Sequence, residues 1–321
     1  MMFKRIMTTA LALMLTGAFA AAGFAADQKV LSLATGGTGG TYYALGGGIS
    51  KLVSEYMPGY KLVVQSTGAS IENTHLVANK RVDFAIVMPD AAYFAFKGER
   101  EFKGRAKYPN LRAVMAGHAS LLQGAALASS GIKSFADLKG KKVALSAPGS
   151  PSKFVSIAAL AAYGLKEGDY KATYLTYSEM VQAIKDGTID ASMVFAGVPT
   201  SSMLDLSATE KINMLPVEKS KMGYIKQNYP YYAAATIKAG TYTGQDKAVP
   251  TLAAPAILIT NSDVPEEAVY LLIKTICEHR EELAKLHKAG AAWGADDATE
   301  GIAIPFHPGA QKYLKEKGTL K

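Results

Sequence analysis

The chain has 321 residues, of which 49% are hydrophobic and 19% are charged, and its formal net charge is +8. This length and composition favour a well-packed protein of two domains and exclude a largely disordered chain. No basic run is interleaved with aromatic side chains, so nucleic-acid binding is not expected, whereas a positive field favours anionic ligands.

The N-terminus has the features of an export signal. Lys4 and Arg5 precede an Ala- and Leu-rich apolar run, and Gly23-Phe24-Ala25 places small residues where a signal peptidase cleaves. We expect cleavage after Ala25, with Ala20-Ala21-Ala22 as the second candidate. No later segment supplies the ~18–20 apolar residues of a spanning helix. The mature protein is therefore expected in the periplasm, and an uncleaved membrane anchor is the alternative.

Short β-like runs alternate with helical segments along the mature chain. The runs at 29–34, 61–65 and 82–87 are each followed by a turn and a helix, and the alternation restarts near residue 134. Further strands are expected at 142–146, 173–176 and 191–195, with helices at 150–163, 178–186 and 200–206. This order is typical of an α/β protein with mostly parallel sheets.

A long helix is expected late in the chain, at Pro265–Ala289, with Pro265 in its first turn and Gly290 after its end. Cys277, the only cysteine, lies on this helical pattern and is expected to be a buried small hydrophobe.

Two α/β units in one chain predict two lobes joined by two crossing segments, at about 117–127 and 246–258. Residues 26–120 and 251–321 would form lobe 1, and residues 121–250 lobe 2. Ligands of open α/β sheets bind beyond the carboxyl ends of the strands, which here would face each other across a cleft. Hinge motion would close the lobes around a ligand.

The first turn after a strand, Ala34–Tyr43, is unusually rich in glycine and threonine. Its glycines allow close backbone approach, and the N–H groups at the following helix start favour an anion. Thr38 and Thr41 add hydroxyl donors, while Tyr42 and Tyr43 offer apolar walls and a phenol. The turn lacks the Lys-Ser/Thr of a Walker A loop and the third glycine of a dinucleotide fingerprint.

Two more turns open helices. In 65–73 we expect Ser70 as the N-cap, and in 146–151 we expect Ser150 as the N-cap with Pro151 at the first helical position. With the first turn they would aim three helix N-termini at one cleft, an arrangement that suits a carboxylate. Read singly, each of the two is equally consistent with ordinary turn chemistry.

Catalytic and metal-binding patterns have no positive support. None of the five histidines forms a metal-spaced pair, and no Gly-x-Ser-x-Gly elbow occurs. We therefore expect neither an enzyme nor a cofactor. His118 lies where the first crossing segment should begin, and it is either a satisfied core residue or a ligand contact.

The turns in this order resemble those of the TAXI family of solute receptors for TRAP transporters. The resemblance covers essentially the whole mature chain and rests on Thr35–Tyr43, Ser66–Asn73, Val82–Asp90 and Ile304–Tyr313. It implies a type II two-lobe periplasmic binding protein fold and a membrane partner that uses an ion gradient. The implied ligands are small organic anions, either glutamate-like amino acids or dicarboxylates such as 2-oxoglutarate. We expect a monomer; a sensor subunit, a surface antigen of the same fold and an exported hydrolase are the alternatives.

The resemblance also implies which residues face the cleft. In lobe 1 these are Thr38, Gly39, Gly40, Tyr42, Tyr43, Thr67, Gly68, Ser70, Asn73 and Asp90, with His118 as a further candidate. In lobe 2 they are Gly149, Ser150, Phe195, Gly197 and Val198. The chain departs from the family pattern at Ala69, where glycine is usual, at Met88, and at Pro151, which removes an N–H donor.

Overall fold

The computed structural model describes residues 28–104, 107–148, 150–229 and 232–321. The expected signal peptide at 1–25 lies outside the described residues, as does Gly149. Within the described ranges, no helix combines the length and apolar character needed to cross a membrane.

Lobe 1 is built on three parallel strands that pair in the order β2-β1-β3: β1 (Lys29–Ala34), β2 (Tyr60–Gln65) and β3 (Phe84–Val87). Every residue of β3 is buried, as a strand covered by helices on both faces requires. Each strand leads through a short turn into a helix, namely α2 (Thr41–Tyr56), α3 (Ser70–Ala78) and α4 (Pro89–Lys97).

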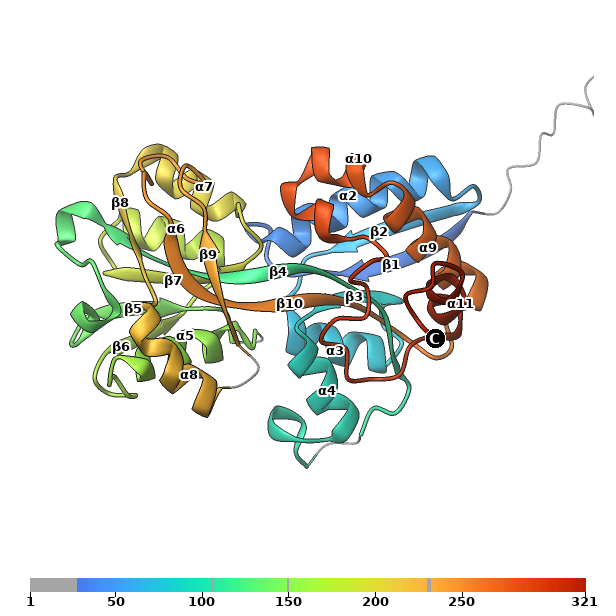
Figure 1. The fold of residues 1–321 in the computed structure, drawn as a ribbon, viewed down its shortest axis with the longest axis horizontal. Helices are drawn as coiled ribbons and strands as arrows, with labels where there is room; N and C mark the ends of the chain where they lie inside the picture. Colours follow the sequence, from blue (N-terminus) through green and yellow to red (C-terminus); the bar gives the residue numbers. More distant parts are fainter. Residues whose placement is uncertain (1–27, 105–106, 149, 230–231) are drawn as a thin grey trace, which may run out of the picture.

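Helices cover both faces of lobe 1 (Figure 1). On one face α2 packs with three late helices, α9 (Glu266–Glu278), α10 (Arg280–Leu286) and α11 (Pro308–Glu316). On the other face lie α3 and α4, whose Val77 and Ala92 join a separate apolar cluster. The C-terminal part of the chain thus returns to the lobe in which the described chain begins.

Lobe 2 repeats the plan with parallel strands in the order β7-β5-β6. Its strands are β5 (Lys142–Leu145), β6 (Lys171–Tyr174), β7 (Ala191–Ala196), β8 (Ile212–Leu215) and β9 (Ala233–Ile237). Its helices are α5 (Ser152–Ala162), α6 (Tyr177–Lys185), α7 (Ser201–Thr209) and α8 (Met222–Asn228). α5 and α8 pack on one face, and α6 and α7 on the other.

Two long antiparallel strands join the lobes, β4 (Leu111–Leu127) and β10 (Val249–Asn261). They run side by side through the middle of the molecule (Figure 1), and Leu121 is the register partner of Ala253. Both predicted crossing segments overlap these strands. All strands of the described chain thereby form one sheet. The fold is therefore α/β with two lobes, as expected, and the lobe boundaries at 120 and 251 stay a prediction.

The predicted strands at 29–34, 61–65 and 191–195 are confirmed to within one residue. The prediction of a single helix at 265–289 is wrong. The helix is interrupted at His279, whose backbone leaves the helical conformation between α9 and α10 (φ −109°, ψ 23°). The His279 ring stacks on Tyr56, with 3.5 Å between ring centroids, so a contact with α2 accompanies the break.

Cys277 packs against the lobe 1 core but is only half-buried, which corrects the expectation of a buried small hydrophobe. Removal from water disfavours the charged thiolate and raises the pKa of its thiol to about 12.

Candidate functional site

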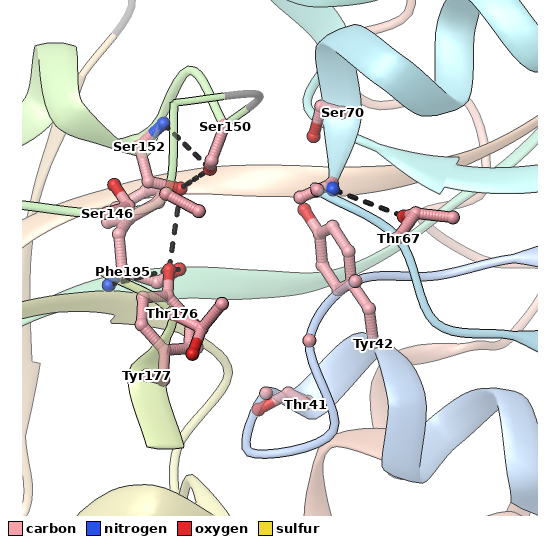
Figure 2. A pocket seen from close by; sticks show the side chains of 17 residues that line it. Thr41, Tyr42, Thr67, Ser70, Ser146, Ser150, Ser152, Thr176, Tyr177 and Phe195 are labelled. Carbon is pink, nitrogen blue, oxygen red and sulfur yellow. Dashed lines mark hydrogen bonds between the residues drawn. The ribbon is translucent and has the colours of Figure 1, made fainter. Parts of the chain in front are cut away.

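A pocket lies between the lobes, at the carboxyl ends of their parallel strands. It encloses about 560 Å³ of space, including the part open to solvent. Its described lining residues are Gly36, Gly37, Gly40, Thr41, Tyr42, Thr67, Gly68, Ala69, Ser70, Ser146, Ala147, Ser150, Ser152, Thr176, Tyr177, Phe195 and Ala196. Figure 2 shows the Tyr42 side of the pocket facing the Tyr177 side. This is where ligands bind in open α/β folds.

The turn from β1 into α2 forms the floor on the lobe 1 side. It is fixed by Thr35, whose N–H and hydroxyl both donate to the Gln65 carbonyl (3.1 and 2.8 Å). Gly40 precedes α2 without any side-chain cap, and its N–H donates to the Gly37 carbonyl at 2.9 Å. The start of α2 is therefore presented by backbone alone, which a ligand can approach closely.

The second turn, from β2 into α3, has a different cap from the one expected. Ser70 is the first helical residue and not the N-cap; its hydroxyl accepts a hydrogen bond from the Met88 N–H at 3.0 Å. The N-cap is Ala69, with φ 75° and ψ −150°. Thr67 closes the turn by accepting from the Ala69 N–H at 3.1 Å.

Asn73 is completely buried and does not line the pocket. Its side-chain N–H group donates to the carbonyls of Thr35 (2.6 Å) and Ile86 (2.9 Å), and its carbonyl accepts from the Thr67 hydroxyl (2.6 Å). Asn73 thus joins the ends of three strands, and its expected contact with a ligand stays a prediction.

Lobe 2 faces the pocket with serines and a tyrosine (Figure 2). Ser150 is not the N-cap that we expected, since Pro151 occupies that place and α5 begins at Ser152. The Ser150 hydroxyl nevertheless accepts from the Ser152 N–H at 3.2 Å. The Tyr177 hydroxyl donates to the Phe195 carbonyl (2.7 Å) and accepts from its N–H (3.2 Å), which fixes the ring against the end of β7.

The lobes touch directly beside the pocket. The Thr41 hydroxyl donates to the Gly197 carbonyl at 2.8 Å, and the Ser202 N–H donates to the Gly39 carbonyl at 3.2 Å. A Cβ on Gly39 would stand 2.7 Å from the Ser178 hydroxyl oxygen, so a side chain there would require Ser178 to move. These contacts are those of a closed arrangement of the lobes.

His118 lies behind Tyr42 and does not line the pocket. Its Nδ1 accepts from the Trp293 indole N–H at 3.1 Å, and burial lowers the pKa of the imidazole to about 3. A Cβ on Gly197 would stand 2.9 Å from His118 Nε2, so the ring also packs against lobe 2. His118 is thus a neutral, buried group at the junction of the lobes, but its Nε2 has no hydrogen-bond partner among the described residues, so the satisfied core role stays a prediction.

Asp90, in the first turn of α4, lines two separate hollows next to the pocket, one of which includes Phe154 and Tyr232. Its carboxylate accepts from the Ala91 N–H at 2.8 Å, and burial raises the pKa of this carboxyl group to about 6. Asp90 is therefore near the cleft but outside the pocket itself.

The structure brings together on the pocket wall Gly40, Tyr42, Thr67, Gly68, Ser70, Ser150 and Phe195 from the predicted set. It places elsewhere Thr38, Gly39, Tyr43, Asn73, Asp90, His118, Gly197 and Val198. Sequence reasoning missed Ser146, Ser152, Thr176 and Tyr177. Thr176 and Tyr177 follow β6 in a fourth turn of the same kind, and the capping box of Thr176 with Glu179 was the available signal. No group of three or more metal-ligating side chains occurs within the described ranges.

Comparison with solved structures shows the same fold. A protein of Bordetella bronchiseptica RB50 is 18% identical, with a TM-score of 0.53, over 90% of this chain and 89% of that one. The ligand-binding component of an ABC-type import system from Staphylococcus aureus, solved with zinc, is 14% identical, with a TM-score of 0.51, over 91% and 92%. The periplasmic aliphatic sulphonate binding protein of Escherichia coli is 18% identical, with a TM-score of 0.49, over 89% and 78%. The model of one protein family matches residues 33–318, and the chain belongs to this family, the NMT1-like family.

Proposed function

We propose that this protein is an exported, non-catalytic solute receptor, which captures a small organic anion in the periplasm and delivers it to a membrane transporter. The observation that carries the proposal is a pocket lined by strand-to-helix turns of both lobes. Groups from two lobes can enclose a ligand only when the lobes approach, which couples binding to closure.

The chemistry of the lining supports an anion. Backbone N–H groups at the start of α2 and the hydroxyl of Ser70 are neutral donors, and helix N-termini favour negative charge. Tyr42 and Tyr177 present rings from opposite lobes to the carbon skeleton of a ligand (Figure 2). Hydrolysis is less well supported, since neither serine has a histidine or an acid beside it among the described lining residues.

The order of the turn motifs supports a TRAP-type partner that is driven by an ion gradient. Uptake of a radiolabelled ligand by cells that produce this protein tests this. We expect uptake to stop when the ion gradient is collapsed with an ionophore and to continue when ATP is depleted. Uptake that follows ATP instead would indicate an ABC-type partner.

Binding itself is tested by a thermal-shift screen of small carboxylates and sulfonates on protein purified without refolding, with native mass spectrometry to identify any co-purified ligand. A ligand at a hundred times its Kd stabilises the folded state by ≈ 2.7 kcal/mol, which gives a clear shift. If no organic acid stabilised the protein and none co-purified, the proposed function would be wrong.

The variant Gly37→Leu locates the binding site. Gly37 lines the pocket, and a Cβ there meets its nearest neighbour, Thr176, only at 3.9 Å, so the larger side chain fills the pocket without disturbing the wall. We expect this variant to lose the ligand-induced thermal shift. Gly47→Leu is the matched control, because Gly47 lies on an open face of α2 with nothing within 4 Å of a Cβ; it should keep the shift.

A further inference from the structure

Every described residue that lines the pocket is neutral. The lining consists of glycines, alanines, hydroxyl side chains, two tyrosines and a phenylalanine. Neutral donors can hold an anion in a desolvated site, since bonds from N–H and O–H groups to an ionised acceptor are the stronger kind. A buried ammonium group needs a carboxylate or several free acceptors, and without them its desolvation costs several kcal/mol.

Four hydroxyl oxygens of the pocket already accept hydrogen bonds from backbone N–H groups of the protein. Ser70 accepts from the Met88 N–H, Ser150 from the Ser152 N–H, and Thr67 from the Ala69 N–H, at 3.0 to 3.2 Å. The Tyr177 hydroxyl accepts from the Phe195 N–H and donates to the same residue's carbonyl. Each of these oxygens keeps at most one free acceptor position, and the Ser150 and Thr67 protons are already donated to Ser152 Oγ (2.8 Å) and Asn73 Oδ1 (2.6 Å). Uncharged and partly occupied oxygens of this kind are poor partners for an ammonium group.

The carboxylates near the pocket accept hydrogen bonds from other groups of the protein. Glu72 accepts from the Gly68 N–H at 2.5 Å on the exposed side of the turn. Glu179 accepts from both the N–H and the hydroxyl of Thr176 in the capping box of α6. Asp90 belongs to the neighbouring hollows and accepts from Ala91. None of these acids lines the pocket to meet a positive charge.

We propose that the ligand is an organic acid without an ammonium group, and that the pocket rejects the corresponding amino acid. The proposal rests on the proposed function and narrows it. Of the two ligand classes that the turn motifs imply, it selects oxo- and dicarboxylic acids over glutamate-like amino acids. The discriminating feature is a pocket wall whose described residues include no carboxylate to pair with an ammonium group.

The test is a calorimetric titration of the unmodified protein with pairs of acids that differ only in the α-amino group. The pairs are propionate with alanine, succinate with aspartate, glutarate with glutamate, and 3-phenylpropionate with phenylalanine. Where at least one member of a pair binds, we expect the acid without the amino group to bind at least about tenfold more tightly than the amino acid. This ratio corresponds to the free energy of one hydrogen bond to a charged group. Equal or tighter binding of the amino acid would overturn the inference and leave the proposed function standing. If no acid of either kind bound, the proposed function would fail as well.

A substitution that adds a negative charge to the pocket wall provides a second test. Ala147 lines the pocket at the turn before α5, so Ala147→Asp places a carboxylate at the wall, and Ala147→Asn provides the same shape without charge. We expect the Asp variant to bind the acids without an amino group at least about tenfold more weakly than the unmodified protein does. Its preference within each pair should shift toward the amino acid, while the Asn variant keeps the original preference. Identical preferences in the two variants would contradict the inference. The paired titration on the unmodified protein decides the question if the Asp variant does not fold.

Discussion

At the scale of single residues, Ala69 occupies a backbone conformation that suits glycine. Its φ of 75° and ψ of −150° lie in a region that costs a residue with a side chain of order 1–3 kcal/mol. We expect Ala69→Gly to raise the free energy of unfolding by about 1 kcal/mol, since relief of strain outweighs the added freedom of the unfolded chain. Urea unfolding monitored by circular dichroism measures this.

Ala44→Gly is the matched control for this change, because Ala44 lies within α2. There the same substitution should lower the free energy of unfolding by about 0.5–1 kcal/mol. A loss of stability in the Ala69 variant as large as that in the Ala44 variant would show that Ala69 is not strained.

The residues that sequence reasoning placed correctly on the pocket wall are those whose role is local. Gly40 and Tyr42 follow a strand in a glycine-rich turn, and this pattern is visible in the sequence. The N-cap prediction for Ser70 was wrong, and the partners of Ser70 and Asn73 could not be predicted, because Met88, Thr35 and Ile86 lie in or directly after other strands. A capping motif specifies a hydroxyl near a helix start, but only the tertiary fold decides which N–H that hydroxyl meets.

At the scale of elements, the strands were the most predictable part of the chain, because buried parallel strands are continuous apolar runs between turns. β7 shows this, as all of its residues are buried. The late helix was predicted as one element because its apolar periodicity continues past His279. The Tyr56–His279 stack is non-local, and the next segment packs back on α10, so the break could not be predicted from periodicity.

That next segment is a short 3₁₀ helix, η5 (Lys288–Ala292), which lies directly on α10. A Cβ on Gly290 would stand 2.6 Å from the carbonyl carbon of Leu283 and 2.7 Å from its oxygen. Backbone cannot yield as the end of a side chain can. We therefore expect Gly290→Ala to lower the free energy of unfolding by about 1–3 kcal/mol, measured by urea unfolding.

Gly47→Ala separates crowding at Gly290 from the general effect of replacing a glycine. Gly47 lies within α2, where a Cβ meets nothing within 4 Å, so alanine should stabilise the helix by up to about 1 kcal/mol. If both variants were stabilised, the close approach of η5 to α10 would not exist in solution.

At the scale of the whole molecule, the sequence predicted two lobes and a cleft, but it could not specify how the lobes meet. The hydrogen bonds of Gly39 and Thr41 to lobe 2 join residues more than 150 positions apart. Such contacts leave no periodic pattern in either segment. The strand alternation predicts each lobe separately, and the two long strands β4 and β10 then align them.

The hydrogen bond from the Thr41 hydroxyl to the Gly197 carbonyl is formed between the lobes, at 2.8 Å, and the Thr41 side chain is buried there. The same carbonyl also accepts from Thr200, so removal of the Thr41 hydroxyl leaves no orphaned acceptor. Thr41→Val should therefore weaken the closed arrangement by about 1 kcal/mol, which lowers the affinity for every ligand by about fivefold. Calorimetry with each acid that stabilises the protein measures this factor.

A hydroxyl that bonds within one lobe provides the comparison for this prediction. Thr260, on β10, donates to the Asp83 carbonyl at 2.7 Å and is completely buried in lobe 1. Thr260→Val removes a bond of the same kind, so it should lower the free energy of unfolding and leave the ligand affinities unchanged, because the bond is present whether the lobes are open or closed. Equal affinity losses in the two variants, or a loss in Thr41→Val confined to one acid, would mean that Thr41 acts on the ligand directly and not through closure.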